Sequence, residues 1–167
     1  EHVADGVEAV KWLTAQTEGF EGPSPVEPFP VGDLLGLLQG VFNPPPANGF
    51  TLTDMTYEIT SLDEVRRLWE WYRKYWLPRL RPIVDKFDCD DYALVFAGMA
   101  AAMAPWAGLP IGRISGVRSP FQTGDHDFNI LAAKDQGVAK LFYLDTQAGR
   151  LIEAVPKPDF EVHRIEI

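Results

Sequence analysis

The sequence predicts an α+β fold whose sheet is antiparallel. Two observations lead to this prediction: apolar residues recur at helical spacing in the first two thirds of the chain, and short strand-like segments follow one another in the last third. The chain has 167 residues, of which 46% are hydrophobic and 12% aromatic. This length and composition suit a single domain with a substantial buried core.

The first 49 residues are predicted to form an N-terminal arm or subdomain. A short helix is expected over residues 3–16, and the stretch 18–31 is too rich in proline to form a helix or a central strand. A second apolar helix over 31–41 ends before three consecutive prolines. The chain opens on Glu1 rather than methionine, so we expect that a signal peptide or a preceding domain is missing.

Residues 50–167 are predicted to form the main domain. Alternating apolar residues indicate a strand over 51–59, and Ser61 with Glu64 forms a capping-box pattern for a helix that runs to Trp76. A second helix is expected from Asp88 to Met103. The strands predicted after it are 111–117, 126–132, 138–145, 150–155 and 160–167.

Composition excludes several functions. The chain carries 15 Lys and Arg against 24 Asp and Glu, a net charge of -9, which argues against binding to nucleic acid or anionic membranes. No apolar run approaches the ~20 residues that span a bilayer. The single cysteine, Cys89, excludes an internal disulfide and a zinc site built from several cysteines.

Cys89 is expected to be the first residue of a helix capped by Asp88. Free backbone N–H groups and the helix dipole favour a thiolate there, although an inert buried cysteine is the alternative interpretation. Asp85, Asp88, Asp90 and Asp91 crowd the thiol and should raise its pKa. A nucleophile at this position therefore needs a cation, either an imidazolium or a divalent metal such as Ca²⁺. Helix capping in a solvated loop would also explain these carboxylates.

His126 opens a predicted strand after a Gly-Asp turn, and it shares one face of that strand with Phe128. A hairpin turn over 134–137 places His126 opposite Asp145 on the next strand, where a carboxylate could orient the imidazole. A register shift of two residues would bring Gln147 there instead, and Glu153 is a poorer third candidate. Alternatively, Asp145 merely ends its strand.

The ordered set of Cys89-Asp-Asp-Tyr-Ala at a helix start, His126 opening a strand and Asp145 ending the next resembles the papain/transglutaminase-like cysteine peptidase superfamily. Two branches are most similar. One is the calcium-dependent C-terminal protease domain of the Marasmius oreades agglutinin type, and the other comprises bacterial transglutaminase-like proteases. The resemblance covers roughly residues 56–155. It implies a helical half, with Cys at a helix N-terminus, packed on an antiparallel sheet.

Carried over by position, the resemblance makes Cys89 the nucleophile, His126 the general base and acid, and Asp145 the orienting residue. It implies that Asp90 and Asp91 bind Ca²⁺. Asp88, Asp127 and Asn129 are implied as further calcium ligands. One departure is Ile83, which stands where the papain pattern has the glutamine of the oxyanion hole.

The function predicted first is a calcium-dependent cysteine peptidase or amidase that acts on a peptide or protein through an acyl-enzyme; acyl transfer is a variant of it. The alternative is a non-catalytic calcium-binding interaction module that retains the papain-like fold. A third prediction is a precursor in which the arm over 18–49 covers the active site. The calcium hypothesis favours an extracellular, periplasmic or phage-associated location.

Overall fold

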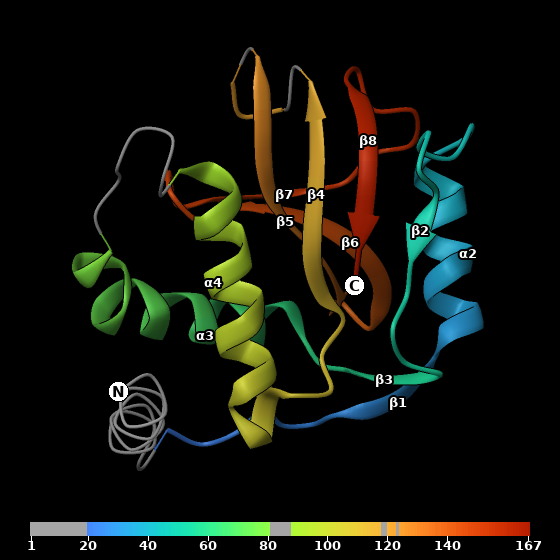
Figure 1. Cartoon of the computed structure of the whole chain (residues 1–167). Coiled ribbons are helices and arrows are strands. Elements are labelled where there is room, and N and C mark those ends of the chain that lie inside the picture. Colours follow the sequence, from blue (N-terminus) through green and yellow to red (C-terminus); the bar gives the residue numbers. More distant parts are fainter. Residues whose placement is uncertain (1–19, 81–87, 118–119, 123) are drawn as a thin grey trace, which may run out of the picture.

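The computed structural model describes residues 20–80, 88–117, 120–122 and 124–167 (Figure 1). The helix predicted over 3–16 lies outside these residues, as do His2, Ile83 and Asp85. Within the described part of the chain, every helix is too short or too polar to cross a membrane.

A six-stranded sheet forms the centre of the molecule, in the order β2-β8-β4-β5-β6-β7. All neighbouring strands are antiparallel except β2 and β8, which are parallel. The strands are β2 (Phe50–Thr51), β4 (Ile111–Val117), β5 (Asp125–Asp135), β6 (Val138–Asp145), β7 (Arg150–Glu153) and β8 (Glu161–Glu166). β4 and β6 have the predicted bounds, and β5 is longer than predicted at both ends.

The strand predicted over 51–59 is divided into two pieces that join different sheets. β2 belongs to the large sheet, whereas β3 (Thr56–Ile59) pairs with β1 (Glu27–Pro30) in a separate two-stranded ribbon. Between the two strands, the backbone N–H groups of Thr53 and Asp54 donate hydrogen bonds to the Tyr57 hydroxyl. Prolines are tolerated in β1 because it has an unpaired edge.

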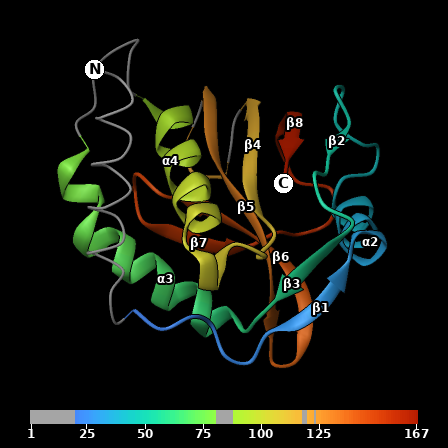
Figure 2. The ribbon, with the colours of Figure 1, turned by 60° about the horizontal axis from the view of Figure 1, so that its bottom comes forward.

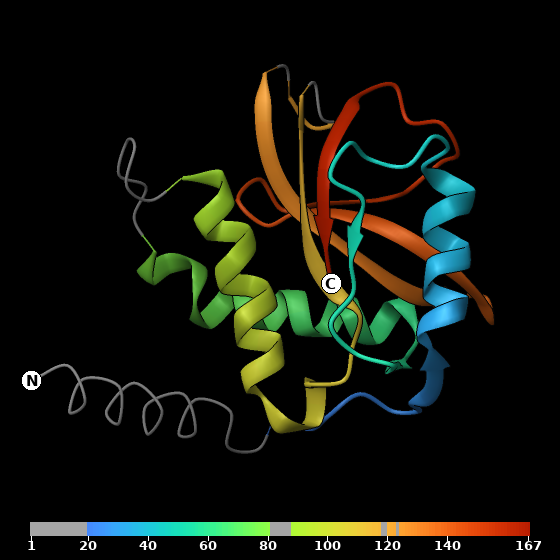
Figure 3. The same ribbon diagram turned by 45° about the vertical axis from the view of Figure 1, so that its right-hand side comes forward.

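Helices cover both faces of the large sheet (Figures 1 and 3). α3 (Leu62–Tyr75) and α4 (Cys89–Ala102) bury their apolar faces against Leu131 and Leu144. α2 (Val31–Val41) packs on the other face, in the same cluster as Ile130 and Tyr143. Figure 2 shows the β1–β3 ribbon running beneath the sheet between α3 and α2. Two short 3₁₀ helices, Leu77–Arg79 and Ala104–Trp106, follow α3 and α4.

The prediction of a helical half packed on a sheet is wrong. Six consecutive residues of β5, Phe128 to Ala133, are buried, so both faces of this strand are covered. Such a strand belongs to a central sheet with helices on either side, rather than to a sheet with one helical partner. Leu34 and Leu38 of α2 are fully buried and form part of this core. The predicted boundary between residues 49 and 50 stays a prediction.

The starts of α3 and α4 were predicted correctly. The Ser61 hydroxyl accepts a hydrogen bond from the backbone N–H of Glu64 at 3.3 Å, which caps α3. α4 begins at Cys89, with Asp88 as its N-cap residue. The Asp88 backbone N–H donates to the Asp91 carboxylate at 3.3 Å. The backbone at the start of α4 is thus fixed by its own acidic residues.

Candidate functional site

Cys89 lies where the first turn of α4 meets the beginning of β5. Its side chain is half-buried, and its Sγ accepts a hydrogen bond from the backbone N–H of Asp127 at 3.5 Å. This contact ties the thiol to the strand that carries His126. The prediction that Cys89 lies at a helix N-terminus is confirmed, since α4 begins at this residue.

The surroundings of Cys89 disfavour the thiolate. Burial raises the pKa of the Cys89 thiol, and the charges of Asp127, Asp88 and Asp90 raise it further. The backbone N–H of Asp127 lowers this pKa, but the net shift is upward. The expectation that nearby carboxylates oppose ionisation is thus confirmed for Asp88 and Asp90, and Asp127 adds to them.

A single guanidinium connects the site to three carboxylates. Arg113 of β4 places Nη1 3.8 Å from Asp90 Oδ2 and 3.7 Å from Asp127 Oδ2, and its Nη2 lies 3.0 Å from Glu166 Oε2. The Ser115 hydroxyl donates to Asp127 at 2.8 Å. Burial nevertheless raises the pKa of the Asp127 carboxyl, although Ser115 and Arg113 act to lower it.

The role of Arg113 was missed from the sequence. Arg113 and Ser115 alternate along β4 and pair in register with Asn129 and Asp127. Alternation along 111–117 could have shown that Arg113 and Ser115 share a face. It could not have shown which strand lies beside them, because β4 and β5 are separated by a connection rather than a tight turn.

The structure brings His126 and Asp145 together. His126 Nε2 lies 3.4 Å from Asp145 Oδ2, and both side chains are buried. Neither ring nitrogen of His126 has a hydrogen bond of ordinary geometry among the described residues. The His126 ring packs against Phe128 and Phe121, with centroid separations of 5.7 and 6.3 Å.

His126 therefore points to the face of β5 that carries Phe128, whereas Asp127 and Asn129 point toward α4. The Asn129 amide confirms this alternation, since it donates to the Ala93 carbonyl of α4 at 2.8 Å. Cys89 meets the strand through the backbone of Asp127.

The hairpin register differs by two residues from the main prediction. β5 and β6 pair with Asp135 opposite Val138 and Asn129 opposite Leu144. Continued to the strand end, this register places Gln147 opposite His126 and leaves Asp145 diagonal to it. The alternative with Gln147 was therefore the correct register, yet Asp145 is the residue that reaches the imidazole.

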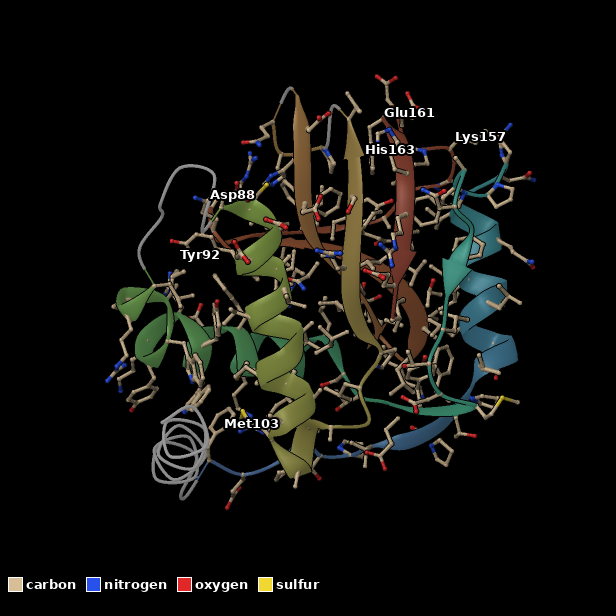
Figure 4. The ribbon with its side chains drawn as sticks, in the orientation of Figure 1. Asp88, Tyr92, Met103, Lys157, Glu161 and His163 are labelled. Carbon is tan, nitrogen blue, oxygen red and sulfur yellow. The ribbon has the colours of Figure 1, made fainter. Side chains whose placement is uncertain are left out.

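Three predicted calcium ligands lie together at the start of α4. Asp88, Asp90 and Asp91 each offer an oxygen within 4.8 Å of the others, and Figure 4 shows Asp88 at this exposed corner. A hydrogen bond to Asp90 raises the pKa of Asp88, and the negative charges of Asp90 and Asp91 raise it further. Hard oxygen donors at this spacing suit Ca²⁺. Asn129 differs, because it is fully buried and its amide donates to Ala93 and Gly112.

Comparison with known proteins shows one similarity of fold. No family model and no curated protein matches the sequence. Two solved structures share the fold with TM-scores of 0.62 and 0.61, each at 20% identity and over 84% of this chain. The first is a complex of PSL1a with E64, and the second is Polyporus squamosus lectin bound to the epitope Neu5Acα2-6Galβ1-4GlcNAc. The chain spans about half of each of these chains (51% and 49%).

These findings correct the family prediction. The neighbour that is named in words is a lectin, and neither title names a peptidase. The assignment to the papain/transglutaminase-like cysteine peptidases is therefore wrong, together with its papain-like fold class and its cysteine-peptidase activity. Likeness at this identity shows the fold alone.

The partner prediction changes with it. A peptide or protein substrate was predicted, whereas the second neighbour is a lectin with a bound glycan. The predicted peptide and the glycan of this neighbour are both binding partners, so the coarser prediction of a partner is compatible with the comparison. The grouping of Cys89, His126 and Asp145 into one site stays a prediction, as does the binding of Ca²⁺.

Proposed function

We propose that the chain is a non-catalytic binding module whose ligand site lies where α4 meets β4 and β5. The observation that carries the proposal is the fold shared over 84% of the chain with proteins titled as a glycan complex and an E64 complex. Since the chain spans about half of those proteins, the ligands themselves are part of the proposal.

The polar groups at this site suit a ligand that carries many hydroxyl groups. Asp90 and Asp127 offer carboxylate oxygens that accept hydrogen bonds, and Arg113 offers N–H donors. The Ser115 hydroxyl donates to Asp127, so its oxygen can still accept. A sugar presents hydroxyls that both donate and accept, so it can pair with both kinds of group. We therefore include carbohydrate as the partner class, in place of a peptide.

Ca²⁺ would complete the site electrostatically. Arg113 contacts the carboxylates of Asp90, Asp127 and Glu166, and Arg164 contacts that of Glu166. The carboxylates of Asp88 and Asp91 lie beside that of Asp90. The site thus has a local excess of negative charge. Asp88, Asp90 and Asp91 would hold the ion, which would offset the repulsion that raises the pKa of Asp88.

The first experiment tests whether Cys89 belongs to a ligand site. E64 is an epoxide that alkylates thiols, and intact-mass spectrometry counts the adducts on the full chain. We expect one adduct, absent from Cys89→Ser, with a rate that rises as pH passes through the raised pKa of the thiol. Asp127→Asn removes a neighbouring negative charge, so its pH profile should shift to lower pH and its rate at pH 7 should rise about threefold.

Calcium and the glycan are tested on the same protein. Added Ca²⁺ should also shift the labelling profile to lower pH, and Asp90→Asn with Asp91→Asn should remove that shift. The trisaccharide Neu5Acα2-6Galβ1-4GlcNAc is then titrated by calorimetry into the free and the E64-labelled protein. Binding that labelling weakens supports a glycan at this site. No adduct at Cys89, together with no heat of binding, would contradict the proposed function.

A further inference from the structure

A pocket lies on the side of the molecule away from Cys89. It is a hollow of about 470 Å³ between the loop that follows α2, residues 42–47, and the segment 157–162 that leads into β8. We refer to it as the proline pocket. Figure 4 shows Lys157 and Glu161 at its rim, beside β8, whereas Asp88 lies across the sheet at the start of α4.

Backbone hydrogen bonds hold both walls of the proline pocket. The Lys157 N–H donates to the Val41 carbonyl at 2.9 Å, and the Asn48 N–H donates to the His163 carbonyl at 3.2 Å. Four prolines, Pro44, Pro45, Pro46 and Pro158, line the walls and restrict their backbone. The pocket is therefore largely formed before any ligand arrives, as ligand sites usually are.

Lys157 has a strained backbone at the rim. Its φ of 55° lies in the left-handed region, which is unfavourable for residues other than glycine. A glycine there would avoid the strain. Strained residues of this kind cluster at ligand-binding sites.

The lining combines apolar surfaces with hydrogen-bonding groups. Phe42, Phe160 and Val162 form apolar walls, and Asn43, Lys157 and Glu161 supply an amide, an ammonium and a carboxylate. Behind the two aromatic rings, the ring of Tyr143 lies 6.4 Å from Phe42 and 5.7 Å from Phe160. Its buried hydroxyl has no hydrogen-bond partner among the described residues.

We infer that the proline pocket binds one neutral sugar unit of a glycan. A pyranose ring has an apolar face that packs on aromatic and proline rings, and its hydroxyls pair with both donors and acceptors. A phosphate ligand would meet the exposed Glu161 carboxylate, which lies 3.5 Å from His163 Nε2, and a purely apolar ligand would not use the amide, ammonium and carboxylate of the lining. The inference rests on the proposed function only in taking the chain to be a binding module.

The test uses N-acetyllactosamine, Galβ1-4GlcNAc, and the full chain labelled with ¹⁵N. Amide chemical shifts are followed during titration to millimolar sugar. We expect saturable shifts in 42–47 and 157–162. Lys157→Gly, which relieves the strained φ, and Glu161→Gln should each weaken binding at least threefold while the melting temperature stays equal or rises. Lys74→Ala, an exposed change on α3, is the matched control and should leave binding unchanged.

Three results would overturn the inference. These are no saturable shift in the wild-type protein, unchanged affinity in both pocket variants, and shifts confined to Cys89, Asp127 and their neighbours. The last result would still support the proposed function, because it places the sugar at the first site. Conversely, pocket shifts that persist after E64 labelling support the proline pocket even if Cys89 proves to have no ligand.

Discussion

At the residue scale, Asp145 connects an imidazole to a turn. Its Oδ1 accepts hydrogen bonds from the N–H groups of Gln147 at 3.0 Å and Ala148 at 2.8 Å, while its Oδ2 faces His126. Burial alone would raise the pKa of Asp145, but His126 and the two N–H groups outweigh it. The net pKa is below the ordinary value, so the ionised carboxylate stabilises the folded chain.

Asp145→Asn should therefore destabilise the protein in a pH-dependent way. At pH 7 we expect a loss of about 1–3 kcal/mol in the free energy of unfolding, because an amide accepts weaker hydrogen bonds than a carboxylate. A depressed pKa gives stability that is present above about pH 4 and is lost as the pH falls through the folded-state pKa. Urea unfolding of both proteins from pH 7 to pH 3 should show the difference shrink.

The matched control for this prediction is Asp159→Asn, which alters an exposed carboxylate. It should change the free energy of unfolding by less than about 0.5 kcal/mol at every pH. A constant difference between wild type and Asp145→Asn across the pH range would contradict an electrostatic origin.

Single residues were predicted well where the signal is local. Alternation placed His126 with Phe128, and the Ser61 and Asp88 caps were read from short patterns. Arg113 was not predicted, because its three carboxylates come from α4, β5 and β8. No local pattern reports a contact that depends on how distant segments pack.

At the element scale, the β5–β6 hairpin shows why the register was misjudged. Its turn consists of two residues, Gln136 and Gly137, with φ angles of 51° and 81°. Both lie in the left-handed region, as a type I′ turn requires. Gly137 signals such a turn, but glutamine is an unusual first residue, so a four-residue turn over 134–137 was inferred instead.

Two glycine-to-alanine changes should have opposite effects. Gly137→Ala places a Cβ on a residue with φ of 81°, so it should lower the free energy of unfolding by about 1 kcal/mol or more. Gly36→Ala lies in the exposed middle of α2 with open space around the new Cβ, so it should raise stability by roughly 0.5–1 kcal/mol. Thermal melts of both variants measure this. A gain from Gly137→Ala would contradict the turn geometry.

At the scale of the whole molecule, the sheet divides the core into two parts. One cluster includes Ile114 and lies with α2, and the other includes Leu68 and lies with α3 and α4. The sequence predicted both kinds of element but not this division. Helical periodicity shows that a helix has an apolar face, but it does not show which face of a sheet that helix covers.

Because the core is divided, substitutions in the two clusters should have additive effects on the free energy of unfolding. Ile114→Val should lower the free energy of unfolding by about 0.5–1.5 kcal/mol and Leu68→Ala by about 2–5 kcal/mol. Because the sheet separates the two sites, the double variant should lose the sum to within about 0.5 kcal/mol. Since both clusters share β5 and β6, each variant should still unfold in one transition.

Urea unfolding followed by tryptophan fluorescence and by far-UV circular dichroism measures both the sum and the cooperativity. Tyr72→Leu combined with Phe96→Leu is the control for coupling, because these rings touch within one cluster at a centroid separation of 5.0 Å. That pair should deviate from additivity by 0.5 kcal/mol or more. If Ile114→Val and Leu68→Ala deviate as strongly, the two clusters are coupled through the sheet. If the two probes report separate transitions, the α2 side and the α4 side unfold independently, and the sheet does not join them into one cooperative unit.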